Sequence, residues 1–145
     1  MRLWHYKLLP YLPDAQFNGQ LRELVAIMHD WRDKGQTNHI LINRVMDYPK
    51  GELYSYFLEY AVAYQQRYGD RVPKQADEFR DFARDPRGFC LTPFVGWHDK
   101  AYLRVCMANL YEKHVYGRGS SRISDAEWER LLEGYAAITG EAYEI

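Results

Sequence analysis

The sequence predicts an all-α fold, a compact single domain over residues 1–145 with three main helices, shorter helices and long loops. The chain has 145 residues, a usual length for one domain with one apolar core. Apolar residues recur every three or four positions in several segments, which is the spacing of one helix face. Glycines and prolines mark the ends of these segments, and no internal repeat or low-complexity stretch is present.

The first helix is expected from Asp14 to about Lys34, after an extended opening segment and a turn marked by two prolines. Asp14 is expected to cap the start of this helix, and Gly35 to end it. The face expected to be buried consists of Phe17, Leu21, Leu24, Met28 and Trp31. Glu23 lies off this face, so we expect its side chain at the surface or in a cleft, because a carboxylate in the core is costly.

A second long helix is expected over residues 50–68, with Gly69 where a left-handed cap normally ends a helix. Its apolar face consists of Leu53, Phe57, Tyr60, Ala61 and Tyr64. Residues 37–48 favour a short helix, although an extended segment also fits, and Pro49 ends either one.

The C-terminal half predicts a short helix over residues 75–84 and a loop over residues 85–96. A third long helix is expected over residues 99–114, with His98 and Asp99 more typical of a helix cap than of a metal site. Ser124-Asp-Ala-Glu127 is a capping-box sequence that opens a last helix, which Gly140 ends.

Composition restricts the possible functions. The net charge is −1, so any nucleic-acid surface has to be local rather than spread over the whole protein. The chain holds 13 Tyr, 6 Phe and 4 Trp, whose rings serve mainly as core and can also stack on unpaired bases. Cys90 and Cys106 match no metal or redox spacing, so free thiols are expected, and the five histidines share no metal-ligand spacing. We therefore expect no metal and no cofactor.

No apolar stretch has the roughly 20 residues that span a bilayer, and the N-terminus lacks the pattern of a signal peptide. The sequence therefore predicts a cytoplasmic protein without a membrane partner.

The opening 24 residues, MRLWHYKLLPYLPDAQFNGQLREL, carry the most specific signal in the chain. Arg2 precedes a helix that contains Arg22-Glu23-Leu24, and this arrangement resembles the pyrimidine-dimer DNA glycosylases of the endonuclease V type. The chain is also similar to uncharacterised bacterial proteins that begin with MRLWH and continue through a Gly-Gln-x-Arg-Glu stretch, which is Gly19 to Glu23 here. The resemblance covers about the first 30 residues well and the helix from Lys50 onward loosely.

The resemblance implies DNA repair: excision of a damaged base from double-stranded DNA, with strand cleavage at the abasic site. The implied nucleophile is the N-terminal α-amine, which belongs to Met1 because Arg2 is too bulky for methionine removal. An α-amine has a pKa of about 7.7–8.0, so roughly a tenth of it is neutral and nucleophilic at pH 7. Glu23 is the implied partner that stabilises charge on the sugar and moves protons.

The same resemblance gives Arg2 and Arg22 the role of holding DNA phosphates. Trp4 and His5 are candidates to line the cleft or to stack on an extruded base. The alternative is that they belong to an N-terminal strand packed on the first helix, and the sequence fits both equally well. Ala26 stands where the family has a basic residue, and the C-terminal GEAYEI has no counterpart of its aromatic, basic tail.

Two other functions remain open. The chain is alternatively a non-enzymatic helical module that binds nucleic acid or protein, or a related lyase that acts on another base lesion. The oligomeric state is left open by the sequence.

Overall fold

The computed structural model describes residues 2–37, 43–84 and 89–145, and these residues contain helices and no strand, which confirms the all-α prediction. The long helices are α1 (Asp14–Lys34), α3 (Lys50–Tyr68), α5 (Lys100–Tyr116) and α6 (Asp125–Thr139), with a short α4 (Ala76–Phe82). The described residues also form three 3-10 helices: η1 (Tyr6–Tyr11), η2 (Arg44–Asp47) and η3 (Gly119–Ser121). That residues 1–145 form a single domain stays a prediction.

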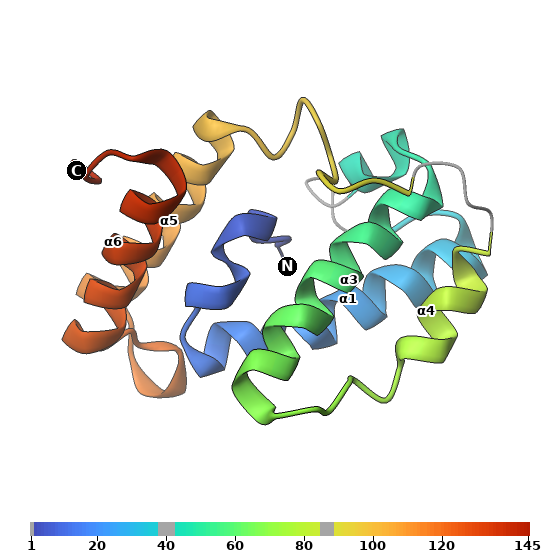
Figure 1. The fold of residues 1–145 in the computed structure, drawn as a ribbon, viewed down its shortest axis with the longest axis horizontal. Coiled ribbons are helices and arrows are strands. Elements are labelled where there is room, and N and C mark those ends of the chain that lie inside the picture. Colours follow the sequence, from blue (N-terminus) through green and yellow to red (C-terminus); the bar gives the residue numbers. More distant parts are fainter. Residues whose placement is uncertain (1, 38–42, 85–88) are drawn as a thin grey trace.

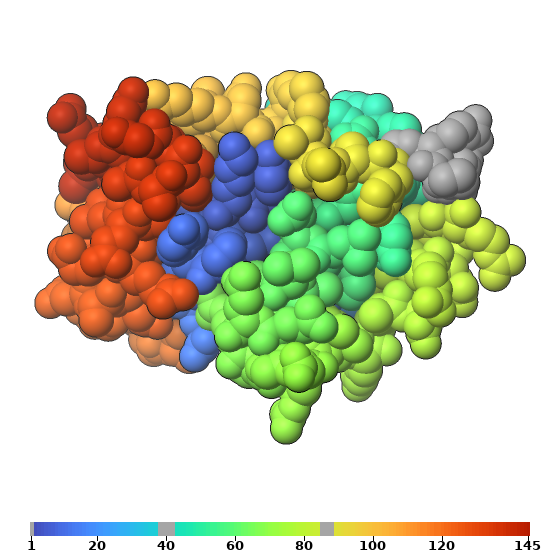
Figure 2. All heavy atoms as spheres, in the orientation of Figure 1, coloured from blue at the N-terminus to red at the C-terminus, as the bar shows by residue number. Residues whose placement is uncertain are grey.

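The helices form two groups with the N-terminal segment between them (Figure 1). α1, α3 and α4 lie on one side, and α5 and α6 pack together on the other. η1 contacts both α3 and α6, and in the space-filling view its atoms fill the seam between the two groups (Figure 2). The N-terminal segment is therefore part of the core that joins the two groups.

Local sequence signals set most helix ends as predicted. Gly35 and Gly140 adopt left-handed conformations at the ends of α1 and α6. The Ser124 hydroxyl accepts the amide proton of Glu127, and the Glu127 carboxylate accepts that of Ser124, so the predicted capping box is present. Asp99 caps α5 by accepting the amide proton of Tyr102.

Three local predictions are wrong. Pro13, not Asp14, is the N-cap of α1; Asp14 is the first helical residue, and its carboxylate pairs with Arg67 at 2.8 Å. The opening segment is not extended beyond His5, because His5 Nδ1 accepts the amide proton of Lys7 and starts η1. Gly69 has the expected positive φ of 72°, but its ψ of −165° lies outside the left-handed helical region.

The predicted buried face of α1 is correct for Phe17, Leu24 and Met28, which are fully buried. Leu21 and Trp31 are only half-buried, which corrects the prediction that all five residues are buried together. Gln16, Gln20 and Ile27 are buried in their place. Gln20 is buried against the N-terminal segment, to which its amide is hydrogen-bonded, and Gln16 is hydrogen-bonded to Ser121 of η3.

Other predictions are confirmed within one or two residues. Lys50–Tyr68 is helical as predicted, and the predicted helices over 75–84 and 99–114 are α4 and α5. Of the helix favoured over residues 37–48, residues 38–42 lie outside the described residues, and η2 is the helical part described. Of the predicted loop over residues 85–96, residues 85–88 lie outside the described residues as well.

Candidate active site

Residues 2–5 have no regular secondary structure, yet three of them are buried: Leu3, Trp4 and His5. A buried backbone without a helix or sheet needs other partners for its N–H and C=O groups. Side chains from three helices supply these partners, and they fix the start of the chain in one position.

Two residues of α1 hold the backbone of Arg2 and Trp4. Arg2 donates its amide proton to Oε2 of Glu23 over 3.0 Å. The Gln20 side chain donates from Nε2 to the carbonyl oxygen of Arg2 at 2.9 Å, and its Oε1 accepts the amide proton of Trp4 at 2.8 Å. The half-buried carboxylate of Glu23 therefore lies one residue from position 1.

α3 and α5 hold the same segment from the other sides. Tyr56 donates its hydroxyl proton to the carbonyl oxygen of Trp4 at 2.6 Å, and Tyr102 donates to that of Leu3. The amide of His5 donates to Sγ of Cys106 at 3.4 Å. Burial raises the pKa of Tyr56 and Tyr102, so both hydroxyls remain protonated donors.

Gln20 connects these interactions and was missed by the sequence analysis. It is 1% exposed, and both ends of its amide are hydrogen-bonded: Oε1 also lies 3.1 Å from the Tyr56 hydroxyl oxygen, and Nε2 also lies 3.4 Å from Glu23 Oε2. Its position carried a signal, because Gln20 is three residues after Phe17 and four before Leu24, on the buried face. A polar residue on such a face requires a polar partner.

A cleft of about 380 Å³ opens beside this network. Trp4, Arg22 and Glu23 line it together with other α1 residues, and Lys113, Ser120 and Ser121 form the opposite wall. Arg22 is exposed, and the Arg2 guanidinium lies 5.6 Å from the ring of Trp4. The structure thus gathers four predicted site residues, Arg2, Trp4, Arg22 and Glu23, at one place, whereas Met1 lies outside the described residues.

Lys113, Ser120 and Ser121 were also missed, because they follow Glu23 by about ninety residues and match no motif. Gln16 joins the two walls by donating from Nε2 to the carbonyl oxygen of Ser121 at 3.0 Å. The lysine adds a third cation beside the two arginines, which suits the cleft to an anionic ligand.

His5 lies apart from this cleft. Its ring is 3% exposed, stacks on Tyr6 and packs 5.3 Å from the ring of His98, beside a different pocket of about 210 Å³. The pKa of His5 is lowered to about 4, mainly by burial; a hydrogen bond with the His98 backbone opposes this effect, and the nearby Lys7 adds to it. Its role in DNA binding stays a prediction.

Comparison with protein families matches residues 1–76, just over half of the 145 residues, to pyrimidine dimer DNA glycosylase. The chain belongs to the pyrimidine dimer DNA glycosylase family. The match confirms the predicted resemblance, and membership implies a DNA substrate that carries damaged bases. It includes η1, α1 and α3 and stops at the first residue of α4, so the wall formed by Lys113, Ser120 and Ser121 lies outside it. Comparison with curated proteins and with solved structures found no match.

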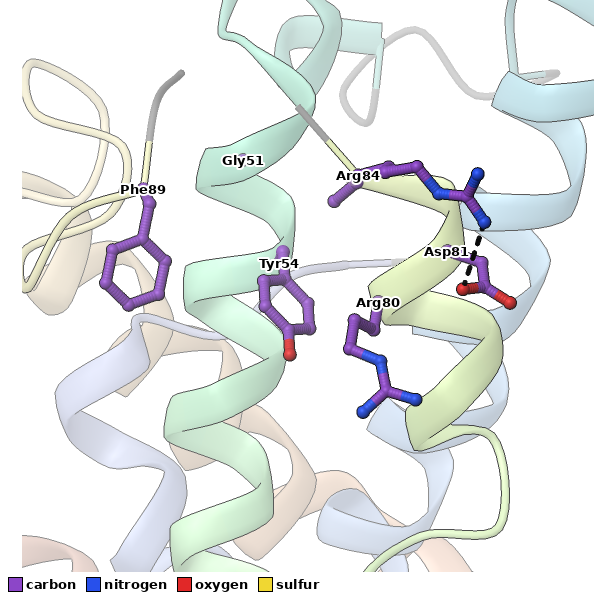
Figure 3. Close-up of a pocket in the computed structure, with 7 residues that line it drawn as sticks. Gly51, Tyr54, Arg80, Asp81, Arg84 and Phe89 are labelled. Atoms are coloured by element: carbon purple, nitrogen blue, oxygen red, sulfur yellow. Dashed lines mark ion pairs between the residues drawn. The ribbon is translucent and has the colours of Figure 1, made fainter. Parts of the chain in front are cut away.

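A third pocket, of about 610 Å³, lies between α3 and α4. Figure 3 shows Tyr54 and Phe89 on its sides, with Arg80 on α4 and an ion pair between Arg84 and Asp81. Both arginines are already paired with aspartates, Arg80 with Asp77 at 2.9 Å. None of the described glycosylase site residues lines this pocket, so the cleft beside Glu23 is the candidate active site of this family member.

Among residues 2–37, 43–84 and 89–145, no group of three His, Cys, Asp or Glu side chains is arranged to hold a metal ion. In the same residues, no helix has the length and apolar character needed to cross a bilayer.

Proposed function

We propose that this glycosylase removes a damaged pyrimidine through its N-terminal α-amine and then cleaves the strand as an abasic-site lyase. The nucleophile is the amine of Met1 and its partner is Glu23. The substrate is double-stranded DNA that carries a pyrimidine dimer or an abasic nucleotide.

The observation that supports this proposal is the hydrogen bond from the Arg2 amide to Glu23 Oε2, 3.0 Å long. Three covalent bonds join the Met1 amine to the Arg2 nitrogen, so covalent geometry limits the amine to within about 7 Å of the carboxylate. A sugar carbon fits between an amine and a carboxylate at such a separation, as a shared reaction centre requires.

The proposed reaction has two stages. The neutral amine attacks C1′ of the deoxyribose, the bond from C1′ to the base breaks, and the base leaves with the bonding electrons and takes up a proton. The nitrogen then loses a proton, and its lone pair forms a double bond to C1′ as the bond from C1′ to O4′ breaks. O4′ takes up a proton, and a protonated imine results. Glu23 accepts a proton from C2′, and the 3′ phosphate leaves by elimination.

Binding of the substrate strand is assigned to the cations around the cleft. Arg2, Arg22 and Lys113 contact phosphates on either side of the damaged nucleotide, while Trp4 forms an aromatic wall. Since the net charge is −1, these few cations have to supply most of the electrostatic attraction.

The test is borohydride trapping on a duplex with one abasic site, because only an imine is reduced to a stable covalent adduct. Intact mass spectrometry first establishes that Met1 is the first residue. A variant with a short uncleavable N-terminal extension is then compared with one that carries the same extension at the C-terminus. We expect the N-terminal extension to reduce trapping at least a hundredfold and the C-terminal extension to leave it unchanged.

Equal trapping by both extended proteins would contradict the amine assignment. Binding of damaged duplex without any adduct from the unextended protein would instead support the non-enzymatic binding module. Release of the base from a duplex that carries a pyrimidine dimer, measured in parallel, tests the lesion.

A further inference from the structure

Gly19 lies in the interior of α1, where a glycine destabilises a helix relative to alanine. Such a residue usually has a reason in the packing. A Cβ atom built at Gly19 meets one neighbour within 4 Å among the described residues, the terminal Nη2 of Arg22 at 3.6 Å. That is an ordinary contact with the far end of a flexible side chain, so the fold as described does not require glycine there.

The contrast with Gly134 shows what a packing requirement looks like in this protein. A Cβ atom at Gly134 of α6 lies 2.4 Å from the ring of Tyr11, which excludes any larger residue without a rearrangement. Gly19 has no such neighbour. Its conformation does not explain it either, because positive φ values among the glycines occur at other positions.

The place of Gly19 suggests the missing reason. Ala15, Gly19 and Glu23 are four residues apart, so they form one row along the surface of α1, and all three line the cleft. Because Ala15 has only a methyl group and Gly19 has no side chain, no large side chain of this row stands in the cleft before Glu23. Ser120 and Ser121 line the same cleft, so this row of α1 and the η3 segment together border the space that reaches Glu23.

A second observation in the same cleft indicates a bound ligand. Gln16 is 8% exposed and lines the cleft, and its Nε2 donates to Ser121, which fixes the orientation of the amide. Its Oε1 is buried and accepts no hydrogen bond from any residue in the described part of the chain. A buried acceptor without a hydrogen-bond donor costs free energy. The base of a bound nucleotide carries N–H groups of the kind that such an acceptor lacks.

We propose that Gly19 is a clearance position for the substrate: one nucleotide of the damaged strand packs its sugar directly on the backbone of α1 at Gly19. This inference rests on the proposed function and extends it by assigning the part of the cleft between α1 and η3 to the damaged strand. The absence of a side chain lets the sugar approach the helix closely enough for its C1′ to reach Glu23, the next residue of the row. Arg22, beside Gly19, is then positioned for the adjoining phosphate.

The test compares Gly19→Ala and Gly19→Gln with the unaltered protein. Alanine is the better helix former, so we expect Gly19→Ala to raise Tm by about 2–4 °C. The same variant is expected to weaken binding to a duplex with a tetrahydrofuran abasic analogue about tenfold, and the larger glutamine to weaken it at least a hundredfold. Higher stability with weaker binding cannot result from a folding defect.

Ala137→Gln serves as the control for added bulk, since Ala137 is exposed on α6 and lines neither the cleft nor the two other pockets described above. It is expected to leave binding unchanged. Unchanged binding by both Gly19 variants, or a lower Tm for Gly19→Ala, would overturn the inference. The analogue cannot form an imine, so this result is independent of whether the amine chemistry is correct.

Discussion

Tyr56 donates its hydroxyl proton to the carbonyl oxygen of Trp4 across 2.6 Å, and both residues belong to the buried core. This bond joins α3 to a segment that has no secondary structure of its own. Because the segment leads directly to position 1, its rigidity affects both the stability and the proposed chemistry of the protein.

Tyr56→Phe, compared with Tyr60→Phe as the control, separates the effect on stability from the effect on the proposed chemistry. Both tyrosines are fully buried, and Tyr60 donates to the carbonyl oxygen of Phe17 at 2.9 Å. Each change is expected to lower the free energy of unfolding by about 1–3 kcal/mol in urea titrations. Borohydride trapping at saturating DNA should fall at least tenfold only for Tyr56→Phe. Equal trapping rates for the two variants would show that the anchoring of Trp4 does not matter for the reaction.

Glu23→Gln tests the carboxylate itself. Glutamine retains an oxygen that accepts the amide proton of Arg2, so the N-terminal segment should remain in place. It lacks the negative charge and the ability to accept a proton, so strand cleavage at an abasic site should slow by roughly a hundredfold or more. Binding of the abasic-analogue duplex should stay the same or become tighter. Cleavage at the parental rate would rule out Glu23 as the proton acceptor.

The cations of the cleft are expected to determine the salt dependence of DNA binding. Arg22→Ala and Lys113→Ala should each reduce the slope of log K against log salt by about 1, because each removes one phosphate contact. Lys74→Ala is the control, since Lys74 is exposed and does not line the cleft. Fluorescence anisotropy at several salt concentrations measures the slopes, and a slope unaffected by Lys113→Ala would place the DNA elsewhere.

Two buried histidines should make the protein less stable in mild acid. Burial lowers the pKa of His5 to about 4 and that of His98 to about 2, and the His5 ring and Arg44 contribute to the latter. In the unfolded chain both have a pKa of about 6.5, so the unfolded state binds protons that the folded state does not. Stability should therefore be constant above pH 7 and fall as the pH drops from 6.5 towards 4, by about 3 kcal/mol for His5 alone. Urea midpoints and NMR titration of the imidazoles measure this, and a His5 pKa near 6.5 in the folded protein would refute it.

The sequence by itself determined the helices and most of their ends. The helix ends at Gly35, Gly140 and the Ser124–Glu127 capping box depend on groups within four residues of one another. Such local signals can be recognised in the sequence. Glu23 was placed correctly off the buried face of α1 by periodicity, as its position in the cleft lining shows. The arrangement of Arg2 and Arg22-Glu23-Leu24 also indicated the family, which the comparison over residues 1–76 confirms.

Only the tertiary structure decided how the start of the chain is held and which residues face it. The partners of Trp4 and His5 lie 16 and 101 residues away, at Gln20 and Cys106. No periodicity predicts side-chain bonds to an irregular backbone, because they depend on where two groups of helices leave a gap. For the same reason the sequence does not show that Ser120 and Ser121 line the cleft through the contact of η3 with α1, or that Lys113 lines it from α5. His5, five residues from the N-terminus in the sequence, is buried beside His98 instead, because η1 turns its ring into the aromatic core.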